Sequence, residues 1–247
     1  MNLDRVIAVR NNKTVYWDGD RCLKVFCETY SKAEVLSEAL NHARVEETGL
    51  PVPALLEVTM LEGKWAIVTA YVKGKTLARL MAENEEKKEE YIALLARLQR
   101  EAQKKSCPLL HKLSDKIKRK LADAPLDAGT RRALYARLSD MPEGAAVCHG
   151  DFTPSNVIVA DDGTPYILDW SHATQGNAAA DAARTYLFFL LNGSEADAEC
   201  YLDAFCEGSE TGKQSVQAWL PLIAAALSVK VNEGEREALR FFLGENE

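Results

Sequence analysis

VCHGDFTPSN, at residues 147–156, is the stretch that decides the fold of this 247-residue chain, and ILDW follows it at residues 167–170. Around an Asp162-Gly163 turn in this region lie two apolar runs, VIV and YIL. Two apolar runs on either side of such a turn predict a β-hairpin. The hairpin would hold Asn156 on one flank and Asp169 on the other.

Three side chains of this region suit the transfer of a phosphoryl group. Asp151 stands in a His-x-Asp triplet, and its carboxylate can accept or orient the proton of a hydroxyl group. Asn156, five positions later, and Asp169, beyond the hairpin, carry the oxygen ligands that Mg²⁺ prefers. This order resembles the arrangement that kinases use, and the resemblance implies a base at Asp151 and magnesium ligands at Asn156 and Asp169.

The first part of the chain has the pattern of a small antiparallel sheet with one helix. An Asp18-Gly19 turn predicts a hairpin within Thr14–Phe26, and a capping box at Ser31 and Glu34 begins a helix that ends at Gly49. Further strands are expected at Arg5–Val9, Ala54–Met60 and Lys64–Val72.

The remainder of the chain has helical periodicity. Apolar residues recur three to four positions apart in stretches 91–98 and 216–227, and Pro221 should interrupt or restart the last helix. The pattern therefore predicts a sheet-containing part, residues 1–72, and a larger, mainly helical part, residues 73–247.

Composition and charge limit the cellular location and the partners that we expect for the protein. The net charge is −7, which disfavours nucleic acid as a partner, and no apolar run approaches the roughly 20 residues of a membrane helix. Charges at Asp4, Arg5 and Arg10 argue against a signal peptide. We therefore expect a cytoplasmic protein that contacts neither membranes nor nucleic acid.

Together these stretches resemble the aminoglycoside phosphotransferase and choline kinase family, whose members share a protein-kinase-like fold. The resemblance is carried by residues 147–156 and 167–170 and also by CLKVF at 22–26, Glu38 with GLPVP at 49–53, GKTL at 74–77 and DAAR at 181–184. It implies an α+β, two-lobed fold. Residues 1–72 would form the nucleotide-binding lobe, and residues 73–247 would form a helical lobe with the catalytic loop and the acceptor site.

The resemblance also implies how the nucleotide is held. Lys24, which projects from a mostly apolar strand, would pair with the α and β phosphates of ATP or GTP and be steadied by a glutamate of the helix. Glu34 already belongs to the capping box, so Glu38 is the favoured partner. The adenine would bond to main chain between Ala70 and Val72.

The activity that the resemblance implies is transfer of the terminal phosphate, with Mg²⁺, onto a hydroxyl group of a small molecule. The acceptors of such proteins are aminoglycoside-like sugars, choline or other amino alcohols. Beyond Ser194 the chain has eleven acidic and four basic residues, so we also expect a cationic acceptor.

The chain departs from the family pattern in three places. The turn expected to cover the phosphates, residues 11–14, reads NNKT and contains no glycine. Residues 153–155 read TPS where relatives often have His-Pro-Gly, and Asn177-Ala178 stands where Asp-Pro is common. These differences bear on the identity of the acceptor.

Two other functions fit parts of the pattern. A metallohydrolase could use His149, Asp151, Asp169 and His172 as a mixed nitrogen and oxygen site, but it would have no use for Lys24, Glu38 or Asn156. A nucleotide-binding module without catalysis is the second alternative. His149, Asp181 and Arg184 are interpreted as scaffold around the catalytic loop, and Trp219 as core.

Overall fold

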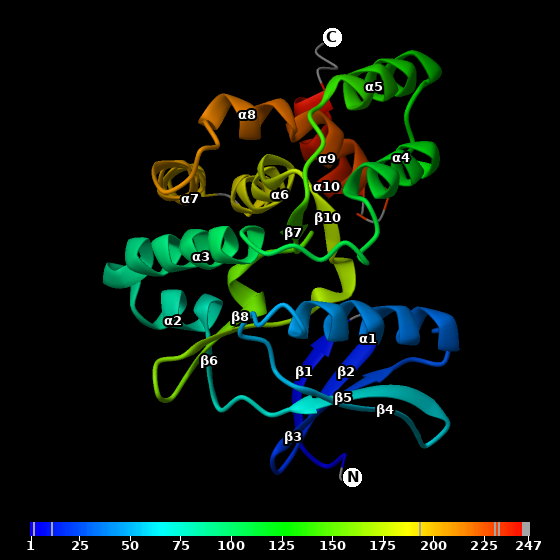
Figure 1. Ribbon diagram of the computed structural model, residues 1–247, viewed down its shortest axis with the longest axis vertical. Helices are drawn as coiled ribbons and strands as arrows, with labels where there is room; N and C mark the ends of the chain where they lie inside the picture. The colour runs from blue at the N-terminus through cyan, green and yellow to red at the C-terminus, as the bar shows by residue number, and fades with distance from the viewer. Residues whose placement is uncertain (2, 11, 193, 230, 232, 244–247) are drawn as a thin grey trace. The chain divides into compact units, whose positions relative to one another are not determined.

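The computed structural model describes residues 1–247 apart from 2, 11, 193, 230, 232 and 244–247 (Figure 1). The chain divides into two compact units, residues 1–80 with 155–173, and residues 81–154 with 174–247. An antiparallel sheet characterises the first unit and packed helices the second, so the expected α+β class is confirmed. The expected roles of 1–72 and 73–247 concern what each part binds and stay predictions.

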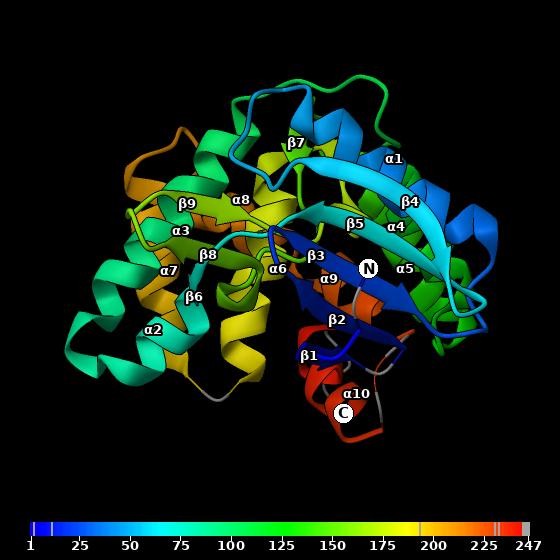
Figure 2. The ribbon, with the colours of Figure 1, turned by 90° about the horizontal axis from the view of Figure 1, so that it is seen from below.

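The first unit is built on a five-stranded antiparallel sheet within the described residues, in the order β1-β2-β3-β5-β4 (Figure 2). Its strands are β1 (Val6–Arg10), β2 (Lys13–Asp18), β3 (Arg21–Phe26), β4 (Leu55–Leu61) and β5 (Lys64–Ala70). The turn between β2 and β3 lies at Gly19-Asp20, one residue later than expected. Asp18 still pairs with Arg21, and the positive φ angle of 65° falls on Gly19, where it costs least.

Alternation along β3 gives the sheet two buried faces. Leu23 and Val25 pack with Ala66 and Val68 on one face. On the other face, Phe26 packs with Ile67 and with helix α1 (Lys32–Glu46). The expected capping box is present, because the Ser31 hydroxyl accepts from the Glu34 amide while the Glu34 carboxylate accepts from the Ser31 amide.

The hairpin that follows the catalytic stretch belongs to the first unit. Strand β8 (Val157–Ala160) pairs with β9 (Pro165–Ile167) on one side and with β6 (Gly74–Thr76) on the other, in a three-stranded sheet of order β6-β8-β9. A Cβ atom on Gly74 would collide with the Val159 backbone, which explains a glycine in this strand. The Ile167 amide donates to the carbonyl of Pro51 at 2.8 Å, which ties the hairpin to the segment after α1.

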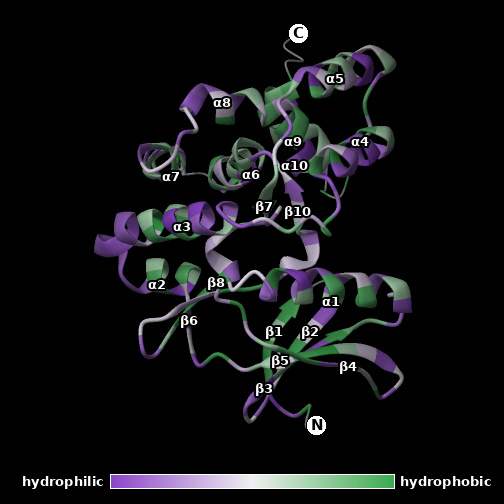
Figure 3. Ribbon diagram, viewed as in Figure 1, coloured by the Kyte–Doolittle hydropathy of each residue, from purple (hydrophilic) through white to green (hydrophobic). Residues whose placement is uncertain are grey.

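The second unit packs its helices around apolar stripes. Helix α9 is almost wholly apolar (Figure 3) and contacts α4, α6 and α8, while α3 and α6 pack on α7. A short pair of strands, β7 (Ala146–Cys148) and β10 (Thr174–Gly176), crosses this unit. Its helices are α3 (Lys88–Gln103), α4 (Leu113–Asp123), α5 (Ala128–Asp140), α6 (Ala178–Leu191), α7 (Glu195–Glu207), α8 (Lys213–Ala218), α9 (Leu220–Leu227) and α10 (Glu233–Arg240).

Short elements complete the path of the chain. Helix α2 (Leu77–Glu83) follows β6, and the 3-10 turns are η1 (Glu85–Lys87), η2 (Pro154–Asn156), η3 (Trp170–His172) and η4 (Phe241–Leu243). Pro221 lies in the first turn of α9, where its missing amide costs nothing, so it restarts the helix as expected. Across the described residues, none of the helices combines the length and the apolar character needed to cross a membrane.

Candidate active site

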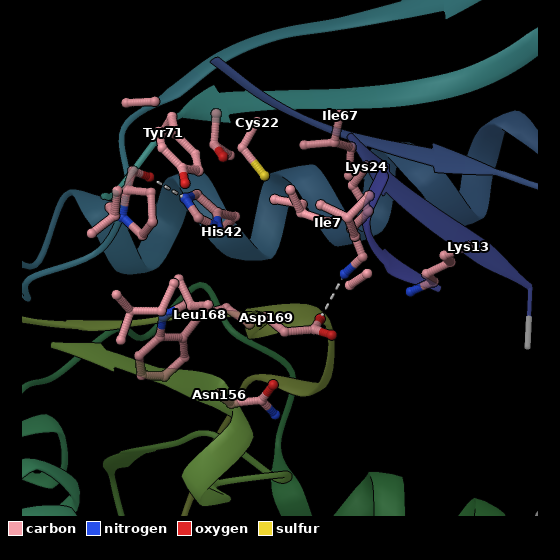
Figure 4. A pocket seen from close by; sticks show the side chains of 18 of the residues that line it. Ile7, Lys13, Cys22, Lys24, His42, Ile67, Tyr71, Asn156, Leu168 and Asp169 are labelled. Atoms are coloured by element: carbon pink, nitrogen blue, oxygen red, sulfur yellow. Dashed lines mark hydrogen bonds and ion pairs between the residues drawn. The ribbon is translucent and has the colours of Figure 1, made fainter. Parts of the chain in front are cut away.

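A cavity of about 290 Å³ lies in the first unit (Figure 4). Its wall is mostly apolar, and four charged side chains line it as well. A mainly apolar wall with a few polar groups is the usual construction of a small-molecule site. The apolar lining includes Ile7, Val15, Ile67, Val72, Ile158 and Leu168, and the charged lining is Lys13, Lys24, Glu38 and Asp169.

Lys24 connects two acidic groups of this cavity. Its Nζ atom lies 2.5 Å from Oε1 of Glu38 and 2.9 Å from Oδ1 of Asp169. Burial by itself would lower the pKa of Lys24, but the attraction of Asp169 and Glu38 outweighs it and raises the pKa. Lys24 therefore stays charged, and the expected pairing with Glu38 is present.

Asp169 adopts an uncommon backbone conformation. Its φ and ψ angles are 57° and 62°, in the left-handed region that aspartate tolerates better than most residues. Burial would raise the pKa of its carboxyl group, but Lys24 outweighs burial and holds the pKa well below its ordinary value. Strained residues of this kind concentrate at functional sites. The conformation aims a permanently ionised carboxylate at the cavity.

Helix α1 holds the site through side chains three and four residues apart. Glu38 forms an ion pair with Lys24. The side-chain amide of Asn41 donates to the carbonyl of Ser171, two residues after Asp169, at 3.4 Å. His42 Nε2 lies 2.7 Å from the carbonyl oxygen of Pro53. Residues at this spacing share one helix face, so a single face of α1 fixes three neighbouring segments.

Asn156 and Asp169 meet at the base of the hairpin. The Leu168 amide donates to the carbonyl of Asn156 at 2.8 Å. This bond joins the residue before Asp169 to Asn156, so the backbones of the two candidate metal ligands lie close together. One ionised carboxylate and one amide oxygen suit Mg²⁺, which completes its coordination with water and phosphate oxygens. In the part of the chain that the structure describes, no group of three or more His, Cys, Asp or Glu could hold a metal.

The segment expected to bind adenine offers one spare backbone donor. The amide of Ala70 donates to Ala54, and that of Tyr71 donates to Asp20. Among the described residues, the amide of Val72 has no hydrogen-bond partner, and Val72 lines the cavity. Of the two predicted contacts, Val72 thus has a donor available, whereas Ala70 could contribute only its carbonyl.

The loop that carries the predicted base, Asp151, lies in the second unit and is held by helix α6. Asp181 accepts from the Gly150 amide at 2.7 Å, Arg184 Nη2 donates to Asp151 Oδ1 at 2.7 Å, and the Thr185 hydroxyl donates to the Phe152 carbonyl at 2.9 Å. The expected scaffold role of Asp181 is confirmed. Arg184 does more than expected, because it contacts the predicted base itself.

The loop is also shaped from within. His149 is buried, and its Nδ1 accepts from the Asp151 amide at 3.2 Å, which fits the structural role expected for it. Asn177 caps α6 by accepting from the Ala179 amide at 2.8 Å. The Asn177-Ala178 departure from the family pattern thus preserves a functional helix cap.

Sequence reasoning missed Lys13, whose Nζ atom lies 2.7 Å from Oε2 of Glu38. The signal was available, because a two-residue turn at Gly19-Asp20 pairs Lys13 with Phe26 and Val15 with Lys24. Cross-strand partners face the same side of a sheet, so both lysines had to share a face. Asn11, in the expected phosphate-covering turn, lies outside the described residues.

A family model described as "Phosphotransferase enzyme family" matches residues 7–219 of this chain. Among curated proteins, none matches by sequence. Solved structures match over nearly the whole chain, at identities that bear on the fold alone.

Two of these structures are named as kinases and a third as a phosphotransferase. The choline kinase LicA from Streptococcus pneumoniae is 13% identical, with 100% of this chain and 94% of that one covered and a TM-score of 0.68. A choline/ethanolamine kinase family protein from Mesorhizobium loti is 15% identical, with 99% and 88% covered and a TM-score of 0.65. A thermostable mutant of aminoglycoside phosphotransferase APH(4)-Ia, solved with ADP and hygromycin B, is 16% identical, with 98% and 94% covered and a TM-score of 0.70. The expected kinase-like fold is confirmed.

Proposed function

We infer that this chain, because it belongs to the phosphotransferase enzyme family, moves the terminal phosphate of ATP or GTP onto a hydroxyl group of a small molecule. The observation that carries this proposal is Lys24, a half-buried ammonium group held between Glu38 and Asp169 in a mostly apolar cavity. An apolar wall suits a purine base, and a fixed cation at its end suits phosphate.

The nucleotide roles follow from this geometry. The base would stack between apolar side chains and accept a hydrogen bond from the Val72 amide, while Lys24 would contact the phosphates. The neighbours support a nucleotide here, since LicA was also solved with AMP and the APH(4)-Ia mutant with ADP. A nucleoside triphosphate as co-substrate also fits the expected cytoplasmic location.

Asn156 and Asp169 are the residues that would hold Mg²⁺. The ion would neutralise negative charge on the phosphate oxygens when bound. The chain itself prepares Asp169 for this role in two ways. Lys24 keeps its carboxylate ionised, and its left-handed backbone directs that carboxylate at the cavity. Two protein ligands leave room for phosphate and water, as this metal requires.

Asp151 would act as the base that accepts or orients the proton of the acceptor hydroxyl. Arg184 forms an ion pair with its Oδ1 atom, and this contact fixes the orientation of the carboxylate. Such a contact holds a carboxylate in one orientation, which favours a defined geometry for proton transfer.

The acceptor we propose is a small amino alcohol or aminosugar, and therefore cationic. The names of the neighbours, choline kinase and aminoglycoside phosphotransferase, support this class. The acidic excess beyond Ser194 also favours a cation. The net charge of −7 argues against nucleic acid as the acceptor.

The test is nucleotide turnover with Mg²⁺ across a panel of choline, ethanolamine, aminoglycosides and neutral sugars. We expect turnover that requires one class of acceptor and is lost in Lys24→Met. Nucleotide binding without transfer to any acceptor would instead indicate the catalytically silent module. A chain that binds no nucleotide at all would contradict the proposal.

A further inference from the structure

We propose that Lys13 is a second phosphate-binding cation that works beside Lys24 and takes over the task of a glycine-rich loop. This inference rests on the proposed function and names a binding residue for the same site. It is carried by the shared contact of both lysines with one carboxylate of α1. Glu38 Oε2 lies 2.7 Å from Lys13 Nζ, and Glu38 Oε1 lies 2.5 Å from Lys24 Nζ.

The sheet places the two lysines side by side. Lys13 begins β2 opposite Phe26, and Val15 lies opposite Lys24, so both ammonium groups leave the same face of the β2-β3 hairpin. Figure 4 shows both at the end of the cavity where Asp169 lies. The Lys13 side chain is only 15% exposed, which shows that it is enclosed in the site rather than spread over the surface.

The ammonium group of Lys13 lies against two aromatic rings. Its Nζ atom lies 5.0 Å from the centre of the Phe26 ring and 5.4 Å from that of Tyr30. Cation-π contacts of this kind restrict a long side chain that would otherwise lose entropy on binding a ligand. Lys13 is therefore preorganised toward the same point as Lys24.

The charge balance leaves room for an anion. Lys13 and Lys24 share one Glu38 carboxylate, and the second positive charge is balanced by Asp169 through Lys24. Asp169 is also the proposed magnesium ligand. Once its charge is shared with the metal, two ammonium groups face a single carboxylate, and phosphate oxygens can supply the missing negative charge.

This arrangement gives a physical reason for the glycine-free turn. Glycine-rich loops bind phosphate with backbone amides, which requires backbone conformations that most residues avoid. Residues 11–14, which the sequence predicts to cover the phosphates, read NNKT, and Lys13 provides a positive charge there instead. A lysine reaches phosphate by its flexible side chain, so the turn needs no glycine.

The test compares how ATP and AMP bind to Lys13→Met, Lys13→Gln and Lys13→Arg by calorimetry, with Mg²⁺ and no acceptor. Lys64→Met is the matched control, since Lys64 lies in the same sheet but does not line the cavity. We expect the two neutral variants to bind MgATP about tenfold more weakly, the scale of one lost charge-assisted hydrogen bond. AMP affinity should stay within about twofold, and Lys13→Arg should recover most of the loss.

Other results separate this inference from the proposed function. MgATP binding that is unchanged in Lys13→Met and Lys13→Gln but lost in Lys24→Met would overturn the role of Lys13 alone. Equal losses for AMP and ATP would also overturn it, because a lysine that merely supports Glu38 affects every nucleotide alike. Absence of nucleotide binding in the unmodified chain would overturn both. Unfolding temperatures of all variants show whether each compared protein is folded.

Discussion

At the scale of single residues, the proposed roles separate binding from chemistry. Lys24, Asn156 and Asp169 belong to the first unit, and Asp151 to the second. The same separation runs through the proposed roles, since the first three hold nucleotide and metal while Asp151 handles a proton. Variants of Asp151 should therefore lose turnover alone, whereas variants of Asp169 should lose nucleotide binding as well.

We predict that Asp151→Asn keeps MgATP affinity near that of the unmodified chain, while kcat falls by roughly 10²-fold or more, the scale of lost base catalysis. Asp169→Asn should weaken magnesium-dependent nucleotide binding as well as turnover, with partial recovery at high magnesium. Asparagine also tolerates the left-handed conformation, so this variant should fold. Titration and steady-state kinetics measure both. Turnover by Asp151→Asn at the unmodified rate would refute its role as base.

Asp169 also predicts a pH dependence of stability. Its carboxyl pKa in the fold lies below the ordinary value of 3.8, so the unfolded chain binds the proton more readily. The stabilisation is complete above about pH 5 and declines as pH falls through 4 and below. We expect the free energy of unfolding, from urea titrations between pH 7 and 3, to fall less steeply with acid in Asp169→Asn. Parallel pH curves for the two proteins would count against the ion pair with Lys24.

At the scale of elements, two helices each fix one part of the site with one face. Helix α1 uses Glu38, Asn41 and His42, and α6 uses Asp181, Arg184 and Thr185. Both sets follow the spacing i, i+3, i+4, which places three side chains on one stripe of a helix. A polar stripe of this kind can position a loop without any contact to the substrate.

We predict that Arg184 is a positioning residue for Asp151. Arg184→Met should lower kcat about tenfold while KM for nucleotide stays within about twofold, because the loop is misdirected and the cavity is untouched. Arg184→Lys should recover part of kcat, since a cation remains but the planar fork is lost. Steady-state kinetics with both substrates checks this. If Arg184→Lys were as impaired as Arg184→Met at equal unfolding temperature, the charge of residue 184 would not be what matters.

Elements with local signals were predictable from the sequence. The capping box predicted the start of α1, and alternation predicted the faces of β3. The Asp162-Gly163 turn between two apolar runs predicted the hairpin that Asn156 and Asp169 flank. The contact between Arg184 and Asp151 was not predictable, because it joins residues 33 apart through tertiary packing. The left-handed conformation of Asp169 is likewise imposed by its surroundings, since no glycine marks it.

At the scale of the whole molecule, the acidic excess is partly neutralised where it lies. On α7, Asp197 pairs with Lys88 at 2.5 Å, and Glu199 and Asp203 both pair with Lys213. Lys213 is already among the four basic residues counted beyond Ser194, so only the pair with Lys88 lowers the acidic excess below that count. Exposed pairs of this kind contribute little and are screened by salt.

We predict that kcat/KM falls with ionic strength for a cationic acceptor. The long-range attraction of a chain with net charge −7 is screened within about 8 Å at 0.15 M salt, so the encounter rate should drop. Kinetics at several salt concentrations, with nucleotide saturating, provide the measurement, and a neutral acceptor of similar size provides the control. A salt response equal for both acceptors would show that attraction to the acceptor has no part in it.

The discontinuity of the first unit has a consequence for how the protein is made. Residues 1–80 leave the ribosome early, but residues 155–173, which bring Asn156 and Asp169 to the cavity, come only after α3, α4 and α5 have been synthesised. During that delay, seconds long at ordinary rates of translation, the sheet has no β8 or β9 beside β6. The nucleotide cavity therefore cannot be completed cotranslationally by the N-terminal segment alone, and ATP can assist folding only after the hairpin has emerged.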